Sequence, residues 1–405
     1  MPTEDNGVSP NDEETVDFVD LPSEDEVDID EQSRFREAVL HATDWTTETI
    51  VSQLRRGNII LNPSFQRRDA WKVPQKSRFI ESLILGLPIP QIVLAESKDR
   101  RGNFIVLDGK QRLLSILQFW GLGEGRNNQY ALSGLAIRKD LGRKKLSHLE
   151  SELELEDDLN ALLNQPIRTV VIKNWPSVDF LHIVFLRLNT GSVKLSPQEL
   201  RQALFPGPFS DWVDDAAVNS QAIKALLNLR DPDYRMRDIE VLSRYLAFRF
   251  FLEDYRGRMK RFLDFSFETF NKDWQQWEPR LHTALKDFES ATDTLAQIFD
   301  SSVGKKPGSK QFNRAVFDFL VFYAQDEQIR AAMAANPAGV REAFENIFTD
   351  AGFRSATERD TAGIPNTVER LSKWGLSLST VIGRDLPIPT VVEDGEEQRL
   401  AFPGF

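Results

Sequence analysis

Residues 105–114 read IVLDGKQRLL, and this stretch decides how the first folded part of the chain is built. Its opening apolar residues are rich in β-branched side chains and predict a strand. Its closing residues begin an apolar pattern at helical spacing, which predicts a helix over 110–120. The turn Asp108-Gly109 joins the two elements. A strand that passes through a tight turn directly into a helix indicates a mixed α+β domain.

The same mixture of short apolar runs and amphipathic helices extends on both sides of this stretch, whereas the pattern after about residue 176 is nearly all helical. Its strongest helix start is Ser196-Pro197-Gln198-Glu199, where Glu199 completes a capping box with Ser196. We therefore predict four regions: a disordered acidic tail over 1–33, a small α+β domain over 34–175, a mainly helical domain over 176–383, and an extended C-terminal tail over 384–405.

The net charge of −12 belongs to one end of the chain. Residues 1–33 hold 13 acidic and no basic residues, so residues 34–405 hold 49 acidic and 50 basic residues. A near-neutral body does not exclude nucleic acid as a partner, and it provides no concentrated basic footprint either. The acidic tail is interpreted as a solubilising segment or as a mimic of nucleic acid.

Composition excludes several kinds of chemistry. The chain has no cysteine, which excludes disulfides, thiolate metal sites and a cysteine nucleophile and fits a reducing cytoplasm. Its four histidines are scattered, and no P-loop spacing is present. No apolar run approaches the roughly 20 residues of a membrane-spanning helix, so we expect a cytoplasmic protein without a membrane partner.

The turn at Asp108 allows two interpretations. Backbone N–H groups at a helix start attract anions, and Lys110 and Arg112 add positive charge there, which favours a guest anion such as a nucleotide phosphate. Gly109 would let that ligand approach the backbone closely. Alternatively, Asp108 is the helix N-cap and Gln111 completes a capping box, with no ligand involved.

Four segments, in order, resemble the N-terminal domain of GmrSD-type, modification-dependent (type IV) restriction systems. Asp108 to Arg112 is similar to that family's D-G-Q-Q-R motif, although Lys110 replaces its first Gln. The other three segments are PSFQRRDAW from Pro63, FIESLILGLPIP from Phe79, and FLRLNTG from Phe185 continuing to LSPQELR at Leu195. The resemblance covers roughly 44–325 and implies a fold related to ParB and sulfiredoxin.

The resemblance also implies nucleotide binding, and in some members NTP hydrolysis, at the positions of the motif. Asp108, Gln111 and Arg112 are the candidate catalytic residues, with Asp108 the candidate Mg²⁺ ligand. The candidate nucleotide-binding residues are Gln66, Arg67, Gly109, Lys110, Asn189, Gln198 and Arg201. Asn189 has an alternative interpretation as part of a helix C-cap, and Arg67 one as a surface arginine in a loop. Lys110 weakens the case for hydrolysis more than the case for binding.

We therefore expect an NTP-binding component of a DNA-targeting, anti-phage restriction system, with hydrolysis left open and the cutting done by a separate nuclease subunit. Larger relatives carry a histidine–metal nuclease module at the C-terminus, whereas residues 330–405 here contain no histidine. Two alternatives stand beside this expectation. One is a protein that binds or cleaves DNA without nucleotide, using the same cleft for backbone phosphate. The other is a regulatory scaffold without catalysis. Separately, the basic cluster over 256–261 is the candidate DNA-facing patch, with a solvated turn as its other interpretation.

Overall fold

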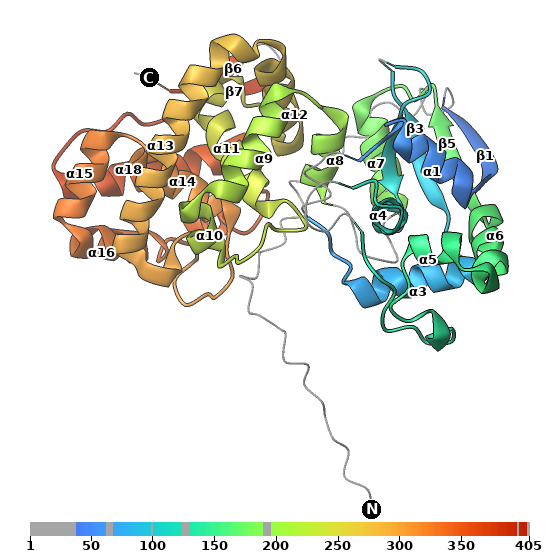
Figure 1. Ribbon diagram of the computed structural model, residues 1–405. Helices are drawn as coiled ribbons and strands as arrows, with labels where there is room; N and C mark the ends of the chain where they lie inside the picture. Colours follow the sequence, from blue (N-terminus) through green and yellow to red (C-terminus); the bar gives the residue numbers. More distant parts are fainter. Residues whose placement is uncertain are drawn as a thin grey trace, which may run out of the picture. The chain divides into compact units, whose positions relative to one another are not determined.

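A five-stranded mixed sheet forms the centre of the first part of the protein (Figure 1). The computed structural model describes residues 38–61, 68–98, 100–123, 129–188, 196–394 and 397–402. The strands are β1 (Val39–Thr46), β2 (Ile59–Ile60), β3 (Ile92–Glu96), β4 (Phe104–Asp108) and β5 (Pro166–Lys173), in the order β1-β5-β3-β4-β2. Strands β3 and β5 run parallel, as do β2 and β4, while the other two pairs are antiparallel. The predicted α+β class is confirmed.

Helices cover both faces of this sheet because the apolar residues of the central strands are buried on both faces. One face packs against α1 (Thr47–Arg55), α3 (Val73–Ile84), α4 (Lys110–Phe119) and α6 (Glu156–Asn164). Ile92 and Leu94 of β3 point into that core, and the intervening Val93 is also buried although it lies outside that cluster. Helices α7 (Val178–Leu188) and α8 (Pro197–Leu204) contact β4.

The chain divides into two compact units. The described residues of the first are those within 38–207 together with 232–237, and those of the second are 208–231 with the described residues after 237. Helices α7 and α8 thus lie in the unit of the sheet, whereas their sequence pattern predicts a boundary before them at 175/176. Their amphipathic pattern resembles that of the later helices, and only their contacts with β4 distinguish them.

The second unit is mainly helical, as predicted. Its helices are α9 (Pro208–Asn219), α10 (Gln221–Leu227), α11 (Arg237–Phe251), α12 (Met259–Lys272), α13 (Trp274–Phe299), α14 (Arg314–Ala324), α15 (Glu327–Ala335), α16 (Pro337–Ile347), α17 (Ala351–Ala356) and α18 (Ile364–Ile382). A buried ion pair of 2.5 Å between Arg244 and Asp318 joins α11 to α14. No helix of the described residues combines the length and apolar content needed to cross a membrane.

The C-terminal stretch forms a hairpin where an extended tail was expected. Strands β6 (Thr390–Asp394) and β7 (Glu397–Ala401) pair antiparallel and contact α18 (Figure 1). Leu400 is fully buried, and the ring of Phe402 meets that of Phe322 at 5.2 Å. Each strand has only five residues, and the acidic stretch EDGEE over 393–397 overlaps the ends of both. This composition does not indicate a β-hairpin in the sequence.

Candidate functional site

The turn between β4 and α4 has the strand–turn–helix form that the sequence predicts. Gly109 is the N-cap of α4 in the left-handed conformation, with φ of 97°, and no side chain caps the helix. A Cβ atom at this position would lie 3.0 Å from Cγ1 of Ile92 and 3.3 Å from Nη2 of Arg112. The turn therefore requires glycine for its backbone conformation and for its close packing.

Asp108 does not cap the helix. Its Oδ1 accepts from the backbone N–H of Gly109 at 2.7 Å, and its Oδ2 accepts from Nη2 of Arg112 at 2.9 Å. Gln111 does not complete a capping box either, because its Oε1 accepts from the backbone N–H of Trp71 at 3.2 Å. The capping interpretation of this motif is wrong.

The guanidinium of Arg112 is fixed by two hydrogen bonds, but one of its buried donors is unsatisfied. Its Nη2 also donates to the carbonyl oxygen of Gln91 at 3.0 Å, and the residue is 7 % exposed. Its Nε is buried and has no hydrogen-bond partner among the described residues. A buried N–H without an acceptor costs about 1–3 kcal/mol, so this guanidinium is positioned at a cost to the fold.

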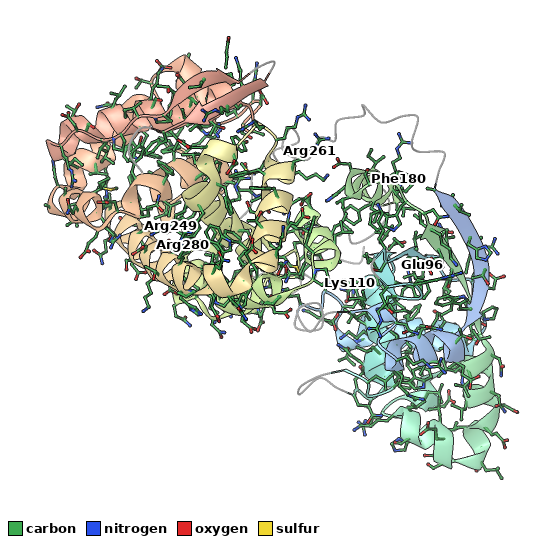
Figure 2. All side chains as sticks on the ribbon, turned by 90° about the horizontal axis from the view of Figure 1, so that it is seen from above. Glu96, Lys110, Phe180, Arg249, Arg261 and Arg280 are labelled. Carbon is green, nitrogen blue, oxygen red and sulfur yellow. The ribbon has the colours of Figure 1, made fainter. Side chains whose placement is uncertain are left out.

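Lys110, which is labelled in Figure 2, is buried at the start of α4 and forms an ion pair with α8. Its Nζ is 2.6 Å from Oε1 of Glu199, and both side chains are 4 % exposed. The other carboxylate oxygen accepts from the backbone N–H of Ser196 at 2.7 Å, which confirms the predicted capping role of Glu199. Burial raises the pKa of the Glu199 carboxyl, and the Lys110 ammonium opposes that shift.

Gln198 and Arg201 lie on the same face of α8, as their spacing predicts. Nη1 of Arg201 donates to Oε1 of Gln198 at 2.6 Å, and both residues are almost fully buried. Nε2 of Gln198 is a second buried donor without a partner among the described residues. Because the ion pair of Lys110 and Glu199 joins the start of α4 to α8, the two unsatisfied donors belong to elements that are linked directly.

A buried polar network beside Trp71 has no counterpart among the residues predicted from the sequence. Nζ of Lys76 forms an ion pair with Asp69 and donates to Oε1 of Gln118 at 2.7 Å, while Nε2 of Gln118 donates to Asp69 at 3.0 Å. Oδ1 of Asp69 also accepts a hydrogen bond at 3.2 Å from the backbone N–H of Trp71, the same N–H that donates to Gln111. A signal was present, because Lys76 falls on the buried stripe of its helix, in step with Phe79.

Residues 232–237 return to the first unit from between α10 and α11, and we call this segment the strap. The Arg68 guanidinium, which is 1 % exposed, donates to the carbonyl oxygen of Asp233 at 2.7 Å. Oγ of Ser196 donates to the carbonyl oxygen of Arg235 at 2.6 Å. The Asp233 carboxylate binds the Arg237 side chain at 2.8 Å. The strap thus holds the N-terminal end of α8.

Three predicted site residues, Gln66, Arg67 and Asn189, lie outside the described residues. Within the described ranges, no group of three or more His, Asp or Glu side chains gathers as a metal site. Asp108 is the carboxylate at the turn. Mg²⁺ is commonly held by one or two carboxylates together with substrate phosphates, so this donor set suits that ion only alongside a bound phosphate.

Comparison with known families supports the resemblance read from the motifs. Residues 47–206 match the N-terminal domain of the GmrSD restriction endonuclease, a range that contains β2 to β5, α4 and α8. No curated protein matches the chain. Residues 47–206 are thus similar to the N-terminal domain of the GmrSD restriction endonuclease, and the match points to a component of a restriction-type system.

Proposed function

We propose that the first unit binds the phosphates of a nucleoside triphosphate at the turn Asp108–Arg112 and that this binding regulates a restriction-type system. The observation that carries the proposal is the pair of buried, unpartnered donors, Nε of Arg112 and Nε2 of Gln198. Buried donors without acceptors are rare in native structures and each costs about 1–3 kcal/mol. Phosphate oxygens are the acceptors that would satisfy both donors.

The surroundings suit a phosphate. The start of α4 has no capping side chain, so its first backbone N–H groups need an acceptor from outside the helix. A helix N-terminus carries roughly half a positive charge, which favours an anion there. Arg112 presents a planar fork that matches phosphate oxygens, and Asp108 fixes the orientation of that fork through its 2.9 Å contact.

Lys110 has a different role from the one its charge suggests. Its ammonium forms an ion pair with Glu199 at 2.6 Å, so its charge is neutralised and the side chain connects α4 to α8. We propose that the phosphate is gripped mainly by Arg112 and the helix start, and that Lys110 sets the position of Gln198 beside them. Gln111, fixed by the Trp71 N–H, would orient a water or the terminal phosphate.

Hydrolysis is the second step of the proposal. Mg²⁺ held by Asp108 and the phosphates would neutralise charge on the leaving group. For Asp108 to do so, its Oδ2 must exchange the contact with Arg112 for the ion, so Asp108 would orient the Arg112 fork before the ion binds and release it to the phosphate afterwards. We propose that a separate nuclease subunit performs the cleavage of DNA.

The test is a calorimetric titration of the full chain with each NTP in the presence of Mg²⁺, carried out for wild type and variants. Arg112→Lys keeps the charge but loses the fork, and Gln198→Met removes the amide while keeping the volume; we expect each to weaken binding at least tenfold. Arg168→Lys is the matched control, since Arg168 lies in the same sheet but is 55 % exposed. Unchanged affinity in Arg112→Lys and Gln198→Met, with intact thermal melting, would refute the site.

A further inference from the structure

The second unit contains a hollow of about 930 Å³ between the turn before α12, the start of α18 and the C-terminal hairpin. Three arginines, Arg256, Arg258 and Arg261, line it. Arg258 and Arg261 are exposed and Arg256 is half-buried. Figure 2 shows the Arg261 side chain projecting away from the helices. Every lining residue of this hollow belongs to the second unit, and none belongs to the turn at Asp108.

The turn that carries these arginines is fixed against α18. Gly257 has φ of 74°, and a Cβ atom there would lie 3.3 Å from the backbone nitrogen of Ile364. The Tyr255 hydroxyl donates to the carbonyl oxygen of Ala362 at 2.5 Å. The Arg256 guanidinium is held by the carbonyl oxygen of Glu253 at 2.7 Å. The arginines are therefore presented from a defined backbone.

Two helices begin at this hollow without a capping side chain. The N-cap of α12 is Arg258 and that of α18 is Gly363, and neither makes a side-chain cap hydrogen bond. Both residues line the hollow. The partial positive charge of the two helix starts adds to that of the arginines and favours an anionic group between them.

The lining also contains three carboxylates, Asp254, Asp360 and Glu393, and an exposed aromatic ring, Phe265 at 42 %. A purely acidic ligand would meet these carboxylates unfavourably. A nucleic-acid strand would place its phosphates on the arginines, stack a base on Phe265, and offer base amino groups to the carboxylates. Unstacked bases are available for this in single strands rather than in duplexes.

We infer that the hollow lined by Arg256, Arg258, Arg261 and Phe265 binds single-stranded DNA through its phosphates and one stacked base. This inference is independent of nucleotide binding at Asp108, because the two sets of residues lie in different units. It assigns the recognition of DNA to the second unit of the protein.

The experiment measures the fluorescence anisotropy of a labelled 12-nucleotide oligo(dC), whose bases carry the amino group that the carboxylates would accept from, with the full chain, across a salt series and without nucleotide. Each arginine–phosphate contact to a single strand contributes about 0.7 to the slope of log affinity against log salt. We expect Arg258→Ala/Arg261→Ala to lower affinity about tenfold and to reduce the slope by about 1.4. Phe265→Ala should lower affinity about fivefold and leave the slope unchanged, as expected for loss of a stacked base.

The matched control is Lys272→Ala/Lys286→Ala, which removes two exposed charges of the same unit outside the hollow. Its affinity should equal that of wild type, and thermal melting should show all variants folded. Equal losses in the control and in the arginine pair would overturn the inference, because binding would then follow net charge alone. Binding of a synthetic peptide of residues 1–33 to the hollow, with no binding of the oligonucleotide, would also overturn it in favour of an acidic-peptide site.

Discussion

The buried ion pair between Lys110 and Glu199 makes a sharp prediction about stability. Its atoms are 2.6 Å apart and both side chains are 4 % exposed, so neither charge has water as an alternative partner. Breaking a buried pair by removing one partner typically costs about 3–5 kcal/mol, because the remaining charge loses the main attraction that offsets its desolvation. Glu199→Gln keeps a carbonyl oxygen that can accept from the Ser196 N–H, so the cap survives and only the charge is lost.

We therefore expect Glu199→Gln to lower the unfolding free energy of the first unit by about 3 kcal/mol. The double variant Lys110→Met/Glu199→Gln should recover most of that loss and fall within about 1 kcal/mol of wild type, since a neutral pair of similar volume has no unpaired charge. The exposed pair of Arg168 and Asp44 is the control, and Arg168→Gln should cost about 0.5 kcal/mol or less.

Hydrogen exchange of the β3 and β4 amides is the suitable assay. A chain with two compact units need not unfold in one step, so a global urea transition would mix their stabilities. Exchange of central strand amides reports the opening of the sheet itself. The reasoning is refuted if Glu199→Gln costs no more than Arg168→Gln, or if the double variant is no more stable than Glu199→Gln.

Two further predictions concern the same unit. Burial raises the pKa of the Glu81 carboxyl, but hydrogen bonds from the backbone N–H groups of 136–138 outweigh it and hold the pKa below its usual 4.5. The stability that Glu81 provides should therefore be present above pH 4.5 and lost as pH falls below it, and Glu81→Gln should flatten this part of a pH series of exchange measurements. An unchanged pH profile in Glu81→Gln would contradict this assignment. Gly109→Ala should lower stability by about 2 kcal/mol or more, because a left-handed backbone and a close contact both oppose a Cβ atom. Gly57 also has a positive φ, but no atom lies within 4 Å of the Cβ position there, so Gly57→Ala should cost only about 1 kcal/mol. Equal melting temperatures for the two variants would show that the close contact at Gly109 has no effect.

The sequence was most informative where local patterns decide the structure. A continuous apolar run rich in β-branched residues predicted β4, helical spacing predicted α4, and the Ser-Pro-Gln-Glu pattern predicted the start of α8 at Pro197. Gln198 and Arg201, which lie three residues apart, share one face of α8 as helical spacing requires. These features depend on neighbours within a few residues, which a sequence displays directly.

Contacts between residues far apart in the sequence could not be predicted, because local patterns carry no information about them. Asp108 and Gln111 have the spacing of a capping box, yet Gly109 takes the cap position and both side chains bind elsewhere. Nothing near Lys110 indicates that its partner lies 89 residues later on α8. The network of Asp69 and Gln118 is likewise assembled by the packing of α3 on α4.

The strap also bears on how this architecture can be divided or recombined. The family match ends at residue 206, but Arg68 and Ser196 have partners at 233 and 235. A fragment cut at that boundary would leave a buried guanidinium without its acceptor and α8 without its anchor. An exchange of helical halves between relatives must therefore keep residues 232–237 with the first half. The junction of such a chimera belongs after the strap rather than at the end of the family match.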